Sequence, residues 1–323
     1  MKSPLTINIL VKNNEETITR LLESMQSINC EYLVGDLGCS DKTIDILVRN
    51  NAKIIRLSGC EDYSVARNEL IKKTATDWIL CLHPYECVLS GINDLTVAVS
   101  GPVCAYNIGI IQGDTLTRQT RLWHKSLQIN YVNPVYETIE TKSEPLNAFV
   151  SSSGSVTNPD IKNLTKRWHE KKPLLSDPLY YMAFNELLDK NWNSFINYAD
   201  LYLHQQKNPT MSKYMTHYYL SLVHCYVKKD YKNAINHISI CILKNPTMAE
   251  FWCLLGDIFY NLKQYEKSYC FYENAKILGS RRLAMSDWPM EISKYDEYPS
   301  KMMDSCKKLI SSTNYYGGSV DKV

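Results

Sequence analysis

The sequence predicts a protein of two parts: an α/β domain built on a mostly parallel sheet, followed by an all-α domain. Short apolar segments alternate with helix-like segments between residues 5 and 82. A related stretch recurs at a fixed offset in the second half of the chain. With 323 residues, the chain is also longer than one hydrophobic core usually accommodates. Two domains of different class are therefore expected.

The α/β prediction rests on four short apolar segments with helical patterns between them. The segments expected to be strands are 5–11, 31–36, 52–57 and 77–82. Between the first two, the apolar residues recur at the spacing of one helix face, namely Ile18, Leu21, Leu22 and Met25. An order of strand, helix and strand gives parallel strands, whose carboxyl ends are where ligands bind.

The all-α prediction rests on an internal repeat with an offset of 34 residues between 215–246 and 249–280. The matched positions are Tyr218 with Trp252, Leu222 with Gly256, Tyr231 with Tyr265, Ala234 with Ser268, and Cys241 with Ala275. A looser copy at 176–209 carries Trp192 where the others have tyrosine. The pattern resembles the tetratricopeptide repeat, in which small residues let two helices approach. We expect three repeats over 176–282, and a capping helix at about 299–310 within the tail, 283–323.

Aromatic side chains in the repeats have two interpretations. They recur at helical spacing and are Tyr218, Tyr219, Trp252, Phe259 and Tyr260. Such residues are usually part of the core, and they can also line a peptide groove. The repeats are accordingly candidates for binding a peptide or protein partner.

Composition excludes several classes of protein. The 36 basic and 34 acidic residues leave a net charge of +2, which gives no basic face for nucleic acid. No apolar run approaches the ~20 residues of a membrane span, and the N-terminal segment lacks the long apolar region of a signal peptide. The protein is therefore expected in the cytoplasm, with its 11 cysteines reduced. Cys81, His83 and Cys87 form only a weak zinc pattern, and buried apolar cysteines are the better interpretation.

Polar side chains follow each of the predicted strands. They are Asn13, Asn14, Asp36, Asp62, His83 and Glu86. Because the carboxyl ends of parallel strands meet at one edge of a sheet, these side chains are expected to converge there. An acid in such a position can also cap the next helix, as Asp41 can. Neither G-x-G-x-x-G nor G-x-x-x-x-G-K-[ST] occurs, so no dinucleotide site of the Rossmann type and no P-loop is predicted.

Three blocks of the sequence resemble glycosyltransferase family 2, whose members have the GT-A fold. In order, they are ILVKNNEETITRLLES, VGDLGCSDKTIDI and EDYSVARNELIKKTATDWIL. The chain is most similar to members that carry C-terminal tetratricopeptide repeats. The resemblance implies a GT-A-type nucleotide-sugar-binding domain at 1–150, joined to the repeats by a connector with a short helix at 151–175. It also implies a nucleotide-sugar donor, most often a UDP-sugar in such relatives.

The resemblance assigns donor-binding roles residue by residue. The candidates are Val11, Asn13, Glu15, Asp36, Asp62, Arg67, His83, Tyr85 and Glu86. Val11 and Asn13 would line the nucleoside pocket, and Asp36 would bind the base or ribose, unless it is only a turn residue. Glu15 follows the position of the family's first acid, where this chain has asparagine. Arg67 would face the diphosphate, with a salt bridge on its own helix as the alternative.

The D-x-D metal motif of the family is replaced here by His83, Pro84 and Tyr85. In relatives, the two acids hold a divalent cation across the donor's diphosphate. Histidine and tyrosine are poor ligands for Mg²⁺ or Mn²⁺, and Glu86 alone would hold such an ion weakly, through water. Three accounts stay open. The protein is a metal-free enzyme in which protonated His83 and Arg67 stabilise the leaving group, a domain that binds donor without turnover, or a scaffold that has lost the site.

A candidate catalytic base lies further along the chain. The residues VYET resemble the part of the family that reads V-H-E: Tyr136 replaces the histidine, and Glu137 keeps the acid. In an inverting transferase a carboxylate deprotonates the acceptor hydroxyl, so Glu137 is the predicted base, with an exposed strand glutamate as the alternative. A local basic cluster is interpreted either as a phosphate contact or as a solvated turn: Arg118, Arg121, His124 and Lys125.

The predicted function is transfer of a sugar from a nucleotide-sugar donor to an acceptor, with inversion and with altered or no metal dependence. The acceptor would be a protein, a glycan or a lipid-linked saccharide, which the repeats would help to hold. The alternative comes from a different class: a non-catalytic interaction scaffold whose transferase domain is degenerate.

Overall fold

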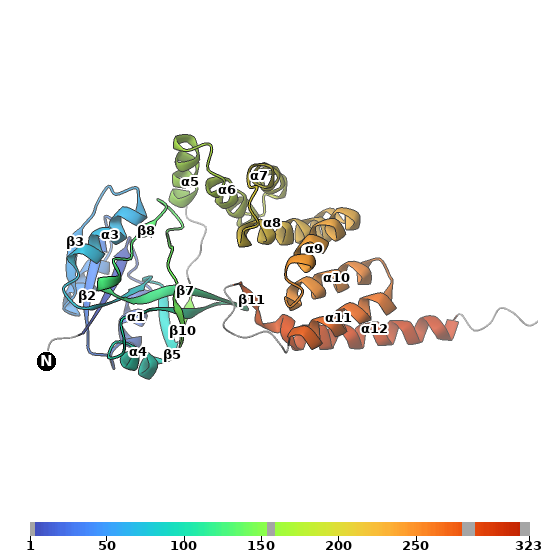
Figure 1. Ribbon diagram of the computed structural model, residues 1–323, viewed down its shortest axis with the longest axis horizontal. Helices are drawn as coiled ribbons and strands as arrows, with labels where there is room; N and C mark the ends of the chain where they lie inside the picture. Colours follow the sequence, from blue (N-terminus) through green and yellow to red (C-terminus); the bar gives the residue numbers. More distant parts are fainter. Residues whose placement is uncertain (1–3, 154–158, 280–287, 317–323) are drawn as a thin grey trace, which may run out of the picture. The chain divides into compact units, whose positions relative to one another are not determined.

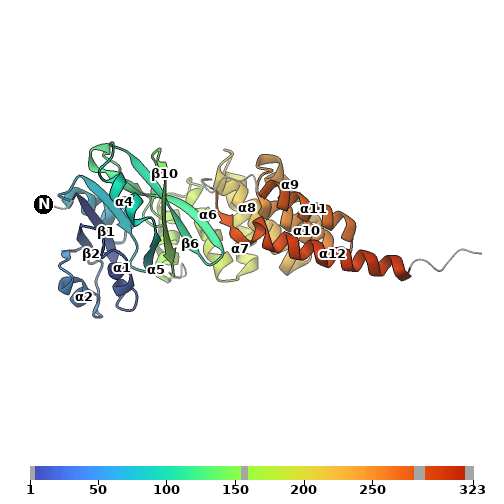
Figure 2. The ribbon, with the colours of Figure 1, turned by 90° about the horizontal axis from the view of Figure 1, so that it is seen from below.

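The computed structural model describes residues 4–153, 159–279 and 288–316, and divides the chain into two compact units, 1–173 and 174–323 (Figure 1). The first unit is a mixed sheet with helices, and the second consists mostly of paired helices (Figure 2). The predicted fold class, an α/β domain followed by an all-α domain, is confirmed. Each unit is described by itself below.

The first unit is built on one large sheet. Its strands are β1 (Leu5–Val11), β2 (Cys30–Asp36), β3 (Lys53–Arg56), β4 (Trp78–Leu82), β5 (Glu86–Ser90), β6 (Ala105–Gln112), β7 (Thr115–His124) and β10 (Glu144–Ser152). They lie in the order β3-β2-β1-β4-β7-β6-β10-β5. The four predicted strands are β1 to β4, and they are parallel to one another. Strand β7 runs antiparallel to both of its neighbours in this order, which makes the sheet as a whole mixed.

The helices of this unit are short and follow the strands. They are α1 (Ile18–Ser24), α2 (Thr43–Arg49), α3 (Tyr63–Lys73), α4 (Ile92–Ala98) and α5 (Pro159–Lys171), with a 3₁₀ turn at Lys125–Leu127. A separate ribbon pairs β8 (Tyr131–Val132) with β9 (Thr138–Ile139). Gly91 starts α4 with a φ of 86°, and a Cβ there would lie 2.3 Å from the Asn147 carbonyl oxygen. Only glycine therefore fits this turn.

The core of the sheet explains why the strand ends come together. All seven residues of β1 are buried, and Ile7 and Ile9 have no exposed surface. The register pairs Val11 with Asp36 across β1 and β2, and Asp36 with Arg56 across β2 and β3. Because these strands are parallel, their carboxyl ends share one edge of the sheet, where the loops after β1, β2 and β4 lie.

The second unit consists of helix hairpins. Its helices are α6 (Asp177–Leu188), α7 (Trp192–Gln205), α8 (Met211–Leu222), α9 (Tyr231–Lys244), α10 (Ala249–Asn261), α11 (Tyr265–Gly279) and α12 (Glu297–Tyr316). A π-helical turn spans Val223–Lys228, a short strand, β11, spans Met290–Glu291, and a 3₁₀ turn spans Ile292–Tyr295. The aligned aromatic residues of the repeat, Trp192, Tyr231 and Tyr265, each begin the second helix of a hairpin.

The small residues of the repeat lie where paired helices cross. A Cβ on Gly256 would lie 2.7 Å from Cε1 of Tyr272 on the partner helix, which is too close. Ser268, which has no exposed surface, donates its hydroxyl hydrogen bond to the Gly256 carbonyl at 2.8 Å. In the preceding hairpin the bond runs the other way, from the Ser221 hydroxyl on the first helix to the Ala234 carbonyl on the second, at 2.8 Å. The repeat in the sequence therefore corresponds to a repeated helix crossing.

The tail and the aromatic residues complete this unit. Helix α12 includes the predicted capping range, 299–310, and is longer, and its Cys306 is fully buried against α11. The aromatic residues considered for a groove lie in or against the helical core, with Tyr218 only 4% exposed. All eleven cysteines are free thiols.

Candidate functional site

The loops after β1 and β2 are locked together by hydrogen bonds at the shared edge. Asn13 has a left-handed backbone, with a φ of 55°, and its side-chain oxygen accepts from the Ser40 amide at 2.8 Å. Asp36 accepts from the Gly38 and Cys39 amides at 2.9 and 2.8 Å. Burial acts to raise the pKa of Asp36, but these amide hydrogen bonds outweigh it, and the pKa is lowered. Asp36 therefore stabilises the turn after β2. Its additional role in binding the donor stays a prediction.

Glu15 lies in the same network. Its carboxylate accepts from the Lys42 amide at 2.9 Å, next to the start of α2, and its own amide donates to Asp41 at 3.0 Å. Asp41 also accepts from the Thr43 amide at 3.0 Å, although the residue at the N-cap position of α2 is Lys42. Val11, at the end of β1, is 1% exposed, and its place in the nucleoside pocket stays a prediction.

Helix α3 carries a buried cation at this edge. Asp62 caps the helix by accepting from the Val65 amide at 3.1 Å. One turn later Arg67, 4% exposed, donates from Nε to Oε1 of Glu137 at 2.5 Å. Its guanidinium also lies 5.2 Å from the centre of the Tyr131 ring. Among the described residues, no hydrogen-bond partner reaches its buried Nη1.

The electrostatics of Arg67 favour the charged form. Burial acts to lower the pKa of Arg67, but the carboxylate of Glu137 overrides burial and raises it. The pairing is therefore a buried ion pair. Glu137 is not on α3, so this pair differs from the predicted salt bridge on the helix itself. Arg67 is also not a free cation, because Glu137 already neutralises it.

His83 is neutral in this arrangement. Its Nδ1 lies 3.2 Å from Nη2 of Arg67. A guanidinium can only donate, so Nδ1 accepts and the ring proton of the neutral tautomer is on Nε2. Burial, Arg121 and Arg67 together hold the pKa of His83 well below its usual range. The expectation of a His83 protonated beside a diphosphate stays a prediction, because this pKa is that of the site without donor, where burial and the two arginines disfavour the charged ring.

Tyr85 and Glu86 complete the end of β4. The Tyr85 ring stacks on that of His83, with 5.2 Å between centroids and 11° between planes. Burial and the neighbouring carboxylate of Glu86 raise the pKa of Tyr85 to about 12, so it keeps its phenol proton. Glu86 is 2% exposed and accepts from Arg121 Nη2 at 3.0 Å and from the His83 amide at 2.8 Å.

These residues do not fit the divalent cation that the family resemblance implies. A hard cation needs available carboxylate oxygens, and each oxygen of Glu86 already accepts a hydrogen bond. His83 offers only the neutral ring, and Tyr85 holds its proton. In the described part of the chain, no group of three or more histidines, cysteines and acids is placed to hold a metal. The idea of a weakly bound Mg²⁺ or Mn²⁺ on Glu86, and of zinc near Cys81, therefore finds no support.

Glu137 lies in the turn between β8 and β9, and β8 is attached to α3. Asn68 of α3 exchanges two hydrogen bonds with the Tyr131 backbone, at 2.8 and 2.9 Å. Tyr136, which precedes the glutamate, has a φ of 51°, an uncommon conformation for a bulky residue. The turn thereby presents Glu137 to Arg67.

The basic cluster predicted on β7 does not form a single site. Arg118 bonds to Asn107 and to the Leu146 carbonyl, and Arg121 to Glu86. His124 pairs with the Ser126 hydroxyl, and Lys125 donates to the Thr74 carbonyl. Alternate strand positions face different neighbours, so these side chains have separate partners, and a phosphate contact stays a prediction.

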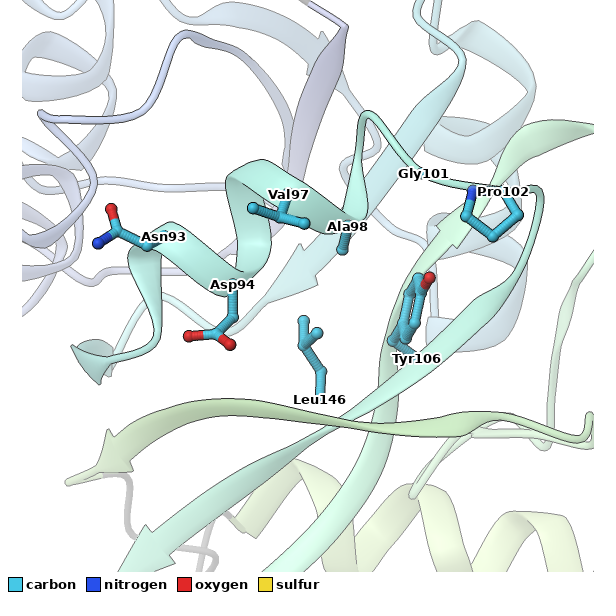
Figure 3. Close-up of a pocket in the computed structure, with 8 residues that line it drawn as sticks. All are labelled: Asn93, Asp94, Val97, Ala98, Gly101, Pro102, Tyr106 and Leu146. Atoms are coloured by element: carbon cyan, nitrogen blue, oxygen red, sulfur yellow. The ribbon is translucent and has the colours of Figure 1, made fainter.

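Sequence reasoning missed two members of the site, Arg121 as the partner of Glu86 and Tyr131 beneath Arg67. The sequence did contain a signal for Arg121, because an arginine next to apolar residues, as in TRLW, is unusual in a strand. A pocket that none of these site residues lines lies elsewhere in the first unit (Figure 3). Its volume is about 300 Å³, and it is lined by Asn93, Asp94, Val97, Ala98, Gly101, Pro102, Tyr106 and Leu146. It lies beside α4, away from the residues of the candidate site.

Comparison with known proteins supports the family resemblance for part of the chain. Residues 6–84 match the model described as glycosyl transferase family 2. This match and the helix hairpins confirm the predicted combination of a family 2 segment with helical repeats. A TPR repeat-containing protein of Synechococcus elongatus is 27% identical over 139 residues, which are 41% of this chain and 34% of the relative. The chain thus spans about a third of the length of the curated relative that it matches.

Solved structures give weaker likenesses. One is MamA, residue 41 to the end, from Desulfovibrio magneticus, with 18% identity, a TM-score of 0.37, and coverage of 50% of this chain and 87% of that chain. Another is S. aureus TarS 1–349 in complex with UDP-GlcNAc, with 12% identity, a TM-score of 0.37, and coverage of 94% and 91%. TM-scores of this size do not by themselves establish a common fold. Separately, none of the helices in the described part of the chain has the length and apolar content needed to cross a bilayer.

Proposed function

We propose that the first unit binds a nucleotide-sugar donor and transfers its sugar to an acceptor without a divalent metal. The family 2 segment at residues 6–84 supports the class of reaction. The observation that carries the metal-free part is the cluster at the end of β4. Arg67 contacts His83 at 3.2 Å, while Arg121 and the His83 amide occupy both oxygens of Glu86.

Arg67 takes the place of the cation in this proposal. Its guanidinium is fixed by Glu137 and Tyr131, and its buried Nη1 is left to donate to a phosphate oxygen. His83 adds the Nε2 proton of its neutral ring, and Tyr85 adds a phenol proton. Donors held in place before the reaction stabilise the charge that develops on a leaving diphosphate. Arg67 is therefore the residue on which donor binding depends most.

Glu137 is the proposed base for the acceptor hydroxyl. Without donor, Arg67 neutralises this carboxylate at 2.5 Å. A bound diphosphate would give Arg67 a second anionic partner and weaken its hold on Glu137, which then accepts the hydroxyl proton. The nucleoside would lie along the β1 and β2 loops, near Asn13, Glu15 and Asp36. The donor class that fits the family is a UDP-sugar, and the acceptor a protein, glycan or lipid-linked saccharide.

A second candidate function is favoured by the charge balance of the same cluster. Two arginines face two glutamates, Arg67 with Glu137 and Arg121 with Glu86, and each pair is largely buried. A cluster that neutralises itself has less attraction for a diphosphate. In this alternative the transferase domain is degenerate, and the helical unit acts as an interaction scaffold.

Donor binding to an Arg67→Lys variant separates the two candidates. Lysine keeps the charge but loses the planar fork, so the affinity for UDP and UDP-sugars should fall at least tenfold in calorimetric titration. Arg49→Lys is the matched control, because Arg49 is exposed at the end of α2, and helices that follow parallel strands end at the opposite edge. Thermal melting checks that both variants are folded. If wild type binds no nucleotide sugar, or if both variants bind like wild type, the proposal fails.

A further inference from the structure

Three of the seven histidines of the chain lie together in one helix hairpin of the second unit, α8 with α9 (Figure 1). His217 is on α8 and His237 is on α9, and their Nδ1 atoms are 2.9 Å apart. The ring of His224 stacks on that of His237, with 5.7 Å between centroids and 15° between planes. The hairpin thus gathers imidazole rings from two helices and from the turn after the first.

The turn that carries His224 is irregular. It is the π-helical turn Val223–Lys228, which directly follows α8. The Nδ1 atom of His224 is buried and has no hydrogen-bond partner among the described residues. The nearest oxygen of Asp230 is 3.8 Å away, which is too far for a hydrogen bond. Since π turns are rare and occur often at functional sites, an irregular turn and an unpaired nitrogen mark the same place as the histidine pair.

The contact between His217 and His237 requires a particular arrangement of protons. Burial lowers the pKa of both rings, that of His217 to about 4. Near pH 7 both rings are therefore neutral, and one Nδ1 donates a hydrogen bond that the other accepts. The neutral ring is also the form that binds a metal ion. If the donating ring moves its proton from Nδ1 to Nε2, both Nδ1 atoms become ligands and no proton is lost.

The distance between the two nitrogens fits two neighbouring positions around one metal ion. Nitrogen ligands about 2.05 Å from a metal are about 2.9 Å apart at a right angle, and about 3.3 Å apart at a tetrahedral angle. The observed distance, 2.9 Å, is that of the right angle. Right angles belong to the tetragonal sites of Cu²⁺ and Ni²⁺, whereas Zn²⁺ prefers a tetrahedron.

The surroundings of the pair leave room for a cation and for water. Lys213 acts on His217 with positive charge, and Asp200 of α7 acts on His237 with negative charge, so neither sign dominates. Both histidines are only half-buried. Among the described residues no third histidine, cysteine or acid is placed to complete the ligand set. Water must therefore occupy the other positions around an ion held here.

We propose that His217 and His237 bind one Cu²⁺ or Ni²⁺ ion through their Nδ1 atoms, with water in the remaining positions. The ion replaces the hydrogen bond between the two rings and joins α8 to α9. His224 is not a ligand, and its stacked ring holds His237 in place. This site belongs to the second unit and is separate from the proposed donor site in the first.

Copper binding to the full chain tests the two ligands directly. One equivalent of Cu²⁺ is added to the wild type, to His217→Gln, to His237→Gln and to His204→Gln, and the electron paramagnetic resonance spectra are compared. His204 is exposed on α7, so its variant is the matched control. We expect two nitrogen ligands on the ion in the wild type and in the control, and fewer in the other two variants.

The affinity for Ni²⁺, measured by calorimetric titration, gives a second reading of the same four proteins. It should fall at least about tenfold in His217→Gln and His237→Gln, since even residues that only support a ligand are worth that much. The control should bind Ni²⁺ like the wild type. The same copper spectrum in all four proteins, or an unchanged Ni²⁺ affinity, would mean adventitious binding elsewhere and would overturn the proposal.

Hydrogen exchange on the wild-type chain keeps the proposal testable if the variants do not fold. An ion that binds only the closed hairpin slows its opening about a hundredfold when the ion is present at about 100 times its Kd. Amides of α8 and α9 that exchange through this opening should therefore slow at least about tenfold with Ni²⁺, and amides of the sheet in the first unit should not change. No slowing, or the same slowing in both units, would lead us to abandon the proposal.

Discussion

Replacing Glu86 by leucine tests how the end of β4 is held together. The carboxylate and its partner Arg121 are 2% and 5% exposed at the side chain, and the two are 3.0 Å apart. Removing one member of a buried pair leaves an uncompensated charge, which costs about 3–5 kcal/mol of unfolding free energy. For a unit of this size, each kcal/mol shifts the melting temperature by roughly 2–4 °C, so a fall of about 6–20 °C is expected. Arg121→Met should cost a similar amount.

The double variant, Glu86→Leu with Arg121→Met, shows whether the two side chains are coupled. With both charges removed, the main remaining loss is the unpaired His83 amide, which donated to Glu86 at 2.8 Å and is worth about 1–3 kcal/mol. The longer hydrogen bond from Arg121 to the Cys81 carbonyl, at 3.3 Å, is lost in the double variant as well as in Arg121→Met. The sum of the single variants, about 6–10 kcal/mol, would therefore exceed the loss in the double variant by at least about 3 kcal/mol. Urea unfolding followed by circular dichroism measures the unfolding free energy of each variant, with the two units fitted as separate transitions.

An exposed pair on the same sheet is the control. Lys53 and Glu31 are 3.1 Å apart, with side chains 68% and 37% exposed, and Glu31→Leu should cost no more than about 1 kcal/mol. If the Glu86 and Arg121 losses are simply additive, the two side chains are not coupled. Glu86 would then be available to a cation, and the reasoning against a metal would be refuted.

Substitutions at three further positions are tested by thermal or urea unfolding. Gly256→Ala should cost about 1–3 kcal/mol, because the new Cβ would lie 2.7 Å from the Tyr272 ring; an unchanged melting temperature would disprove the close crossing. Asp62→Ala should cost about 1 kcal/mol through loss of the α3 cap, and Asp62→Asn clearly less. Burial and His237 lower the pKa of His217 to about 4. Between about pH 6.5 and 4 the unfolded chain therefore binds a proton that the folded chain does not, so the unfolding free energy should decrease as the pH is lowered through this range. His217→Asn should make the unfolding free energy depend less on pH there.

The fold was predictable because its signals are local and repeated. The apolar segments of the sheet and the 34-residue offset of the helices both appear directly in the sequence. The antiparallel strand β7 was not foreseen as the neighbour of β4, since pairing between distant strands leaves no local pattern. The length of α12 was underestimated because its later residues, SSTNYY, carry little apolar periodicity.

The candidate site was predictable in its position but not in its charge states. Asn13, Asp36 and His83 do follow strands whose carboxyl ends share one edge. The sequence does not reveal that Arg67 pairs with Glu137, 70 residues away, or that Arg121 pairs with Glu86. Burial lowers the pKa of His83, and the two guanidinium groups that these pairings place beside the ring lower it further, which keeps the ring neutral. Protonation depends on tertiary neighbours, which a motif cannot supply.

The central claim is that this strand end binds a donor diphosphate without a metal. Its most direct test is calorimetric titration of the wild-type chain with a panel of UDP-sugars, once with excess Mg²⁺ and once with EDTA. The account predicts the same Kd, within about twofold, in both conditions. Binding that appears only with Mg²⁺ would contradict it.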